Sequence, residues 1–273
     1  MARKMRRRSP QVKKSFNQNL IGCRINQKLS FSPLFAKSTK GAKVFWPGCN
    51  LLQLEPDIID KTYDALAEII PGLGFSSFCC GKPSLHVQTE KNFFNRVDWL
   101  NCQIKTAGIK EAYTACPNCQ RMLEQYTSLQ PISVWEVLDK HFPVRLLGAA
   151  AGETWALHDP CAARSDNVSQ QAVRSILDKA GVEIKEFAHN GAKTRCCGNI
   201  DMLMVLDQQK GRTMLEKRLA ETPGDVPVVS YCQGCSKSFS DNGQESRHLI
   251  ELLFGKSSSC NWLNRYKNVS KNR

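Results

Sequence analysis

Ten of the 13 cysteines in this 273-residue chain form two copies of one pattern. Each copy contains a single cysteine, then an adjacent Cys-Cys followed by glycine, and then a Cys-x-x-Cys pair. The ten are Cys49, Cys79, Cys80, Cys116 and Cys119 in the first copy, and Cys161, Cys196, Cys197, Cys232 and Cys235 in the second. Corresponding cysteines lie 112, 116 or 117 residues apart. A nearly constant offset over five positions indicates an internal duplication, so we predict two copies of one metal-binding module.

The composition of each cysteine set restricts which metal it can hold. Thiolates are soft ligands that select zinc, copper(I) or iron–sulfur clusters. Structural zinc takes four tetrahedral ligands, usually from two paired units, whereas each set here has one Cys-x-x-Cys, one adjacent pair and one single cysteine. Neighbouring thiolates fit a multi-iron cluster better, because they can reach different irons. A cubane cluster takes four cysteines. Five therefore indicate a larger or opened cluster, or one thiol that is not a ligand.

The short sequence motifs that contain the cysteines resemble those of a known protein family. Trp46-Pro47-Gly48-Cys49, Phe78-Cys79-Cys80-Gly81, Ala115-Cys116-Pro117-Asn118-Cys119 and His158-Asp159-Pro160-Cys161 resemble the duplicated cysteine-rich CCG domains of the B-type component of heterodisulfide reductase. Similar domains occur in the C-type component of anaerobic glycerol-3-phosphate dehydrogenase and in lactate-oxidation iron–sulfur proteins. The resemblance covers roughly residues 44–255 and implies two non-cubane [4Fe-4S] clusters, each held by five cysteines. It also implies reduction of a small disulfide or related thiol compound.

One feature of the sequence bears on the source of electrons. The chain has no Cys-x-x-Cys-x-x-Cys-x-x-x-Cys run of the ferredoxin type. A partner, either a ferredoxin-like or a flavin-containing redox protein, would then have to supply electrons. Two alternatives stay open at this point. The chain could relay electrons between a dehydrogenase and a quinone without a small substrate of its own, or it could be a structural zinc or cluster-carrying scaffold.

Two polar residues near the cysteines are further candidates. His158, three residues before Cys161, could donate a proton to a departing thiolate, or it could fix its loop by hydrogen bonding. Lys82, next to the first Cys-Cys-Gly, could attract an anionic substrate or a reduced cluster, or it could be a solvated surface residue. The remaining cysteines, Cys23, Cys102 and Cys260, lie outside the repeat, and we assign them no role.

The elements that would position these residues alternate between strands and helices. The patterns predict strands at 42–46, 111–115, 154–158, 182–187 and 227–231, and helices at 57–70, 90–107, 169–180, 201–221 and 246–254. Residues 132–137 have strand composition, with a helix over 135–142 as the alternative. This alternation predicts an α/β fold of two pseudo-symmetric modules, each a small parallel sheet with flanking helices. We place the modules at 44–150 and 151–255.

Charge and hydropathy limit where the protein works. Residues 1–43 carry twelve Lys and Arg and no acid, and residues 256–273 carry five and no acid, so the part between has a net charge of −4. We expect the N-terminal tail to lack regular structure. We expect both basic tails either to be solvated or to dock on an acidic partner or an anionic membrane surface, rather than to bind nucleic acid. With no long apolar run and no secretory signal pattern, we expect a cytoplasmic protein, with peripheral association at the inner membrane face as an alternative.

Overall fold

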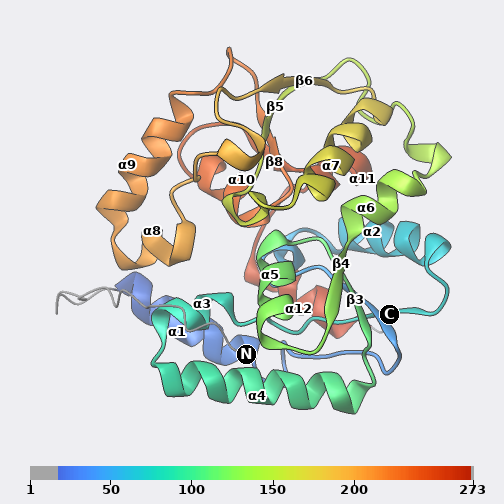
Figure 1. Ribbon diagram of the computed structural model, residues 1–273, viewed down its shortest axis with the longest axis vertical. Coiled ribbons are helices and arrows are strands. Elements are labelled where there is room, and N and C mark those ends of the chain that lie inside the picture. The colour runs from blue at the N-terminus through green and yellow to red at the C-terminus, as the bar shows by residue number, and fades with distance from the viewer. Residues whose placement is uncertain (1–17, 272–273) are drawn as a thin grey trace.

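The computed structural model describes residues 18–271 and contains two four-stranded parallel sheets (Figure 1). The first consists of β1 (Lys43–Trp46), β2 (Leu73–Phe75), β3 (Glu111–Thr114) and β4 (Gln130–Ser133), in the order β2-β1-β3-β4. The second consists of β5 (Thr154–His158), β6 (Glu183–Glu186), β7 (Val228–Ser230) and β8 (Ser246–His248), in the order β6-β5-β7-β8. The identical order confirms the predicted pair of α/β modules.

The central strands of both sheets are apolar because helices cover both of their faces. In β1, Val44, Phe45 and Trp46 are fully buried, and β7 is buried along its whole length. Parallel strands covered on both faces need such continuous apolar runs. In each sheet the second strand of the module pairs with one side of the first strand, and the third strand pairs with its other side. Crevices form at the carboxyl ends of the strands where the order reverses in this way.

Helices connect the strands and begin where the local chemistry favours a start. In the first module they are α2 (Pro56–Ile69), α3 (Lys82–Val87), α4 (Glu90–Ala107), α5 (Pro117–Tyr126) and α6 (Val134–Lys140). In the second they are α7 (Asn167–Lys179), α8 (Leu203–Leu206), α9 (Gln208–Leu219), α10 (Gln233–Ser240) and α11 (Leu249–Phe254). The side chain of Thr89, for example, accepts a hydrogen bond from the Asn92 backbone N–H and caps α4.

Three of the elements expected within the modules need correction. The helix expected at 201–221 is broken, because Asp201 and Met202 adopt left-handed backbone angles (φ 52° and 63°) and Asp207 separates α8 from α9. The helix expected at 246–254 is β8 followed by α11, which starts at a capping box made by His248 and Glu251. The strand expected at 132–137 ends at Ser133, and the alternative helix begins there as α6.

The basic ends contain two further helices. The first, α1 (Gln18–Ser30), falls within the segment that we expected to lack regular structure, and it packs against both α3 and α8. The expectation for residues 1–17 lies outside the described residues. The second, α12 (Trp262–Ser270), packs on the first module, where Asn268 Nδ2 donates to the carbonyls of Leu52 and Leu54 at 2.9 Å. Residues 262–270 are therefore a docked helix and not a solvated tail.

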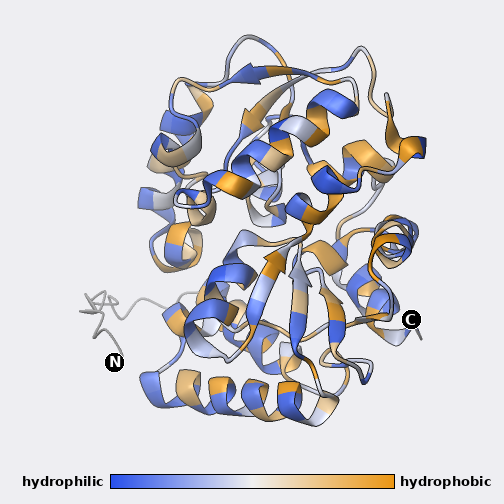
Figure 2. Ribbon diagram, turned by 45° about the vertical axis from the view of Figure 1, so that its right-hand side comes forward, coloured by the Kyte–Doolittle hydropathy of each residue, from blue (hydrophilic) through white to orange (hydrophobic). Residues whose placement is uncertain are grey.

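The two modules share their largest apolar core. It joins residues such as Phe45 and Trp135 of the first module to Trp155 and Tyr231 of the second. Figure 2 shows hydrophobic and hydrophilic residues together on the outer helices. Among residues 18–271, no helix is long and apolar enough to cross a membrane.

Candidate metal centre

The cysteines follow the carboxyl ends of the strands. Cys49 comes three residues after β1 ends, and Cys116 comes two residues after β3 ends, so both lie at the crevice between these strands. Cys116 is also the residue that precedes α5, just as Cys232 precedes α10. A helix N-terminus presents free N–H groups and partial positive charge, which favour a thiolate.

The structure brings the five cysteines of the first module together. The Cys79 thiol donates to Cys49, with an Sγ–Sγ distance of 4.0 Å. Side-chain hydrogen bonds link Cys119 to both Cys116 and Cys80. Because Cys79 and Cys80 are adjacent, the five thiols form one group, which we refer to as the first thiol group.

The second module repeats this arrangement. Side-chain hydrogen bonds join Cys161 to Cys196, Cys196 to Cys197, Cys197 to Cys235, and Cys235 to Cys232. We refer to these five as the second thiol group. All ten cysteines predicted from the sequence as ligands thus fall into two groups of five.

The pKa values of the cysteines show how many thiolates each thiol group can hold. Hydrogen bonding from Cys79 lowers the pKa of Cys49 to about 6, and hydrogen bonds from Cys196 and Cys235 lower that of Cys197 to about 5. The pKa of Cys235, in contrast, is raised well above its ordinary value by its hydrogen bond with Cys197, by burial and by neighbouring negative charge. Each group therefore supports an initial thiolate and opposes further ionisation. Five thiolates can coexist there only if positive charge neutralises them, as bound metal ions would.

His158 provides an independent indication that a metal or cluster binds at the second thiol group. An imidazole nitrogen of His158 and the sulfurs of Cys197 and Cys235 all lie within 4.8 Å of one another. Arg218 Nε donates to His158 Nδ1 at 3.1 Å, and the other ring nitrogen, Nε2, is buried without a partner among residues 18–271. Buried polar atoms in native proteins are normally paired, so this site suits a group that offers an acceptor.

The ring of His158 is electrically neutral. Burial, together with the positive charge of Arg218, lowers the pKa of His158 to about 3. The imidazolium needed to protonate a departing thiolate is then scarce at neutral pH. Of the two interpretations of His158, the geometry favours the one based on hydrogen bonding.

Lys82 lies between the modules. Its ammonium pairs with Asp201 Oδ1 at 3.3 Å, so the residue after the first Cys-Cys-Gly contacts the segment after the second. Its charge also acts on Cys161 of the second thiol group, although the pKa of that thiol is raised overall by hydrogen bonding with Cys196 and by burial. Lys82 is only a quarter exposed, which fits a charge held near the thiols better than a solvated surface residue.

Both Cys-x-x-Cys segments border the interface between the modules. Asn118, between the cysteines of the first Cys-x-x-Cys, donates through Nδ2 to Cys232 Sγ at 3.8 Å. A Cβ built on Gly234, the corresponding residue of the second module, would lie 3.6 Å from Asn50 Nδ2. Sequence spacing did not identify either asparagine, because both lie next to residues of the other module, whereas spacing describes each module alone.

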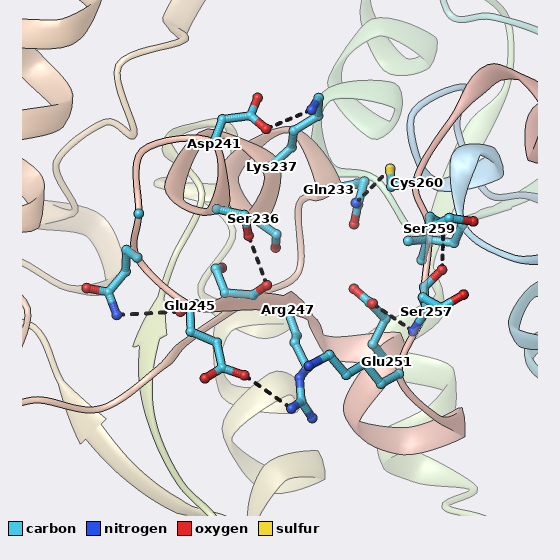
Figure 3. Close-up of a pocket in the computed structure, with 17 residues that line it drawn as sticks. Gln233, Ser236, Lys237, Asp241, Glu245, Arg247, Glu251, Ser257, Ser259 and Cys260 are labelled. Carbon is cyan, nitrogen blue, oxygen red and sulfur yellow. Dashed lines mark hydrogen bonds and ion pairs between the residues drawn. The ribbon is translucent and has the colours of Figure 1, made fainter.

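The other three cysteines lie outside the thiol groups. Cys102 is exposed on α4. Cys23 lies on α1, where burial and the nearby Cys49 raise its pKa. Cys260 lines a pocket of about 420 Å³ next to α10, and its sulfur accepts a hydrogen bond from Gln233 Nε2 at 3.5 Å (Figure 3). None of the ten repeat cysteines lines this pocket.

Comparison with known proteins supports this assignment. The model of the CCG cysteine-rich domain matches residues 43–124 and again residues 155–240. No curated protein shows a significant match. Together with the clustered thiols, the two CCG domains indicate iron–sulfur binding and a redox role.

Among solved structures the likeness is weak. Picrophilus torridus aspartate racemase is 13% identical, with 78% of this chain and 91% of that chain covered and a TM-score of 0.35. An aspartate racemase homologue from Pyrococcus horikoshii OT3 is 12% identical, with 85% and 100% covered and a TM-score of 0.28. Because the domain model matches more than half of the sequence, in two copies, the chain belongs to the family of CCG cysteine-rich domain proteins.

Proposed function

We propose that this chain is an iron–sulfur redox protein that resembles the B-type component of heterodisulfide reductase and reduces a disulfide or related thiol compound at two non-cubane [4Fe-4S] clusters. The observation that carries the proposal is the presence of two complete groups of five thiols that border one interface, across which Asn118 donates a hydrogen bond to Cys232. When bound, the clusters would supply the two electrons that, with two protons, convert one disulfide into two thiols.

The protein's own residues would bind and orient the substrate. The N-termini of α5 and α10 favour negative charge at Cys116 and Cys232. Lys82 adds a positive charge at the junction, where it would hold an anionic substrate or a newly formed thiolate. Because His158 is neutral and Lys82 is paired with Asp201, we expect the two protons to come from solvent.

Electrons would come from a partner, and a cationic groove offers a place for it. Arg24, Lys28 and Arg96 line an open groove of about 610 Å³ together with Phe31 and Trp99. Within the described part of the chain, no acidic side chain lines it. Such a surface favours an acidic redox protein, because opposite charges steer two proteins into contact.

This groove lies next to the first thiol group. The ring of Trp99 lies 5.8 Å from that of Phe78, the residue before Cys79. The Arg96 guanidinium also lies close enough to Cys79 for the two groups to interact electrostatically. A partner bound in the groove would therefore be close to Cys79.

One observation favours the alternative function, an electron relay without its own small substrate. Neither the groove nor the pocket at Cys260 is lined by any of the ten repeat cysteines. A relay needs contact with protein partners only, and it needs no cavity that opens onto a cluster.

Reoxidation by a disulfide separates the two functions. The protein, purified without oxygen and reduced, would be mixed with a small symmetrical disulfide after the excess reductant is removed. A reductase should reoxidise and release two thiols for each disulfide consumed, and the Cys197→Ser variant should not. If the wild-type protein stays reduced with every disulfide offered while it still passes electrons to a quinone, the relay is correct and the reductase proposal fails.

A further inference from the structure

Two aromatic residues occupy equivalent positions in the modules. Trp46 ends β1 and His158 ends β5, each three residues before the first cysteine of its own module. Both side chains are completely buried. They belong to different residue types, but each has a ring N–H group that can donate a hydrogen bond.

In the second module the position of that N–H group is determined by Arg218. Because Arg218 Nε donates to His158 Nδ1, the neutral imidazole carries its proton on Nε2. The guanidinium itself is held over the ring of Phe187 at 3.7 Å and pairs with Glu221 at 3.0 Å. The orientation of the ring is thus fixed, and the Nε2–H group is buried without a partner among residues 18–271. A ring nitrogen of His158 lies within 4.8 Å of the sulfurs of Cys197 and Cys235.

The first module shows the same unpaired donor. The indole Nε1–H of Trp46 is buried and has no partner within the described chain. Trp46 belongs to the same buried cluster as Cys80 and Cys119, the counterparts of Cys197 and Cys235. A buried N–H group without an acceptor is costly, and its recurrence at the same place in both modules is not explained by packing alone.

We infer that the ring N–H groups of Trp46 and His158 each donate a hydrogen bond to a sulfur of the cluster bound by their own module. This inference rests on the iron–sulfur clusters of the proposed function. Both residues are positioning residues, because neither ring has to bind iron. Hydrogen bonds to sulfur stabilise the more negative, reduced cluster and thus raise its reduction potential. The tryptophan and the histidine would set the potentials of the two clusters separately.

The test is a redox titration of the cluster-loaded protein, followed by electron paramagnetic resonance without oxygen. Trp46→Phe and His158→Phe each remove one N–H group, and each should lower the potential of one cluster only. Cys80→Ser and Cys197→Ser, which should each remove or alter one cluster, assign the signals. Trp46→His and His158→Gln return an N–H group and should return the potential toward the wild-type value.

Trp135→Phe is the matched control, since Trp135 is a buried tryptophan in the shared core, which contains none of the ten cysteines. It should leave both potentials unchanged. The inference is wrong if the variants with and without an N–H group titrate alike.

If the phenylalanine variants fail to hold iron, the wild-type protein provides a second measurement. Labelling tryptophan or histidine with nitrogen-15 should reveal weak nitrogen coupling to the reduced clusters in pulsed resonance spectra, and no coupling overturns the inference. A wild-type protein without iron would instead overturn the proposed function.

Discussion

Asn118 Nδ2 lies 3.8 Å from Cys232 Sγ, so an amide of the first module donates a hydrogen bond to a cysteine of the second thiol group. The corresponding residue of the second module is Gly234, which has no side chain to return such a bond. The two modules are related by duplication, but their thiol groups have different surroundings. With clusters bound, this asymmetry would give electrons a preferred site, because a hydrogen bond to sulfur favours the reduced state.

Replacing Asn118 with leucine keeps the size of the side chain and removes the donor. We predict that Asn118→Leu lowers the reduction potential of the second cluster and leaves the first unchanged, as measured by redox titration of the loaded protein. Asn95→Leu, at an exposed position on α4, is the control. An equal shift of both clusters would mean that the amide acts on the general fold and not on Cys232.

Gly48 controls how closely the first cysteine approaches its partners. Its φ is +88°, and a Cβ there would lie 3.1 Å from Cys116 Cβ and 3.2 Å from Cys119 Sγ. We predict that Gly48→Ala displaces the first thiol group and lowers the iron content of the loaded protein by about half.

Gly234→Ala is the control for that substitution. Its Cβ would meet no atom closer than 3.6 Å, which is ordinary van der Waals contact. This variant should keep its full iron content. Equal iron content in the two alanine variants would show that the first group tolerates the displacement.

The largest loss of stability is expected at a buried ion pair. Asp159 is completely buried, and Arg174 Nη2 donates to its Oδ2 at 2.8 Å, while the hydroxyl of Tyr231 donates to Oδ1 at 2.9 Å. Burial alone raises the pKa of this carboxyl, but Arg174 counteracts burial and leaves the pKa below its ordinary value. Arg174→Ala would leave the buried charge without its main partner and should lower the free energy of unfolding by about 3–5 kcal/mol.

Denaturant unfolding of Lys61→Ala provides the comparison. Lys61 pairs with Asp57 on the surface of α2, where both side chains are more than half exposed. Its loss should cost only about 0.3–0.5 kcal/mol. Similar losses in the two variants would show that the Asp159 pair is solvated in solution.

Charge reversal tests the cationic groove. Arg24 and Lys28 are exposed on α1, and we predict that Arg24→Glu together with Lys28→Glu slows reduction by a reduced acidic ferredoxin about tenfold at low salt, because electrostatic steering is lost. Stopped-flow absorbance would follow the rate. The radical cation of methyl viologen should still reduce the variant at least as fast as the wild type. The matched reversal of Arg212 and Lys217, exposed on α9, should change neither rate.

The groove proposal fails if both double variants react alike with ferredoxin. A protein that holds no cluster would give no absorbance change with either reductant, and that result would concern the cofactor and not the groove.

The fold was predictable where one residue pattern determines one element. The strand at Lys43–Trp46 and the helix at Glu90–Ala107 follow from apolar runs and from periodicity, and both are present at the expected places. The break at Asp201 and Met202 was not predictable, because left-handed angles at non-glycine residues arise from tertiary packing. The docking of α12 was likewise hidden, since its contact with Leu52 joins residues that are distant in the sequence.

The candidate site shows the same division. Repetition identified all ten cysteines, because a ligand set leaves a spacing pattern in the sequence. Trp46, Arg218 and Asn118 leave no such pattern. Their importance depends on which atoms they face in three dimensions, and Asn118 acts on the other module altogether.

The central claim is that each group of five thiols holds an iron–sulfur cluster. Metal and sulfide analysis of protein purified without oxygen, combined with electron paramagnetic resonance, tests it most directly. Two four-iron clusters predict about eight irons per chain, a similar amount of acid-labile sulfide, and resonance signals that change on reduction. One or two zinc ions per chain without sulfide would contradict the account and indicate a structural protein.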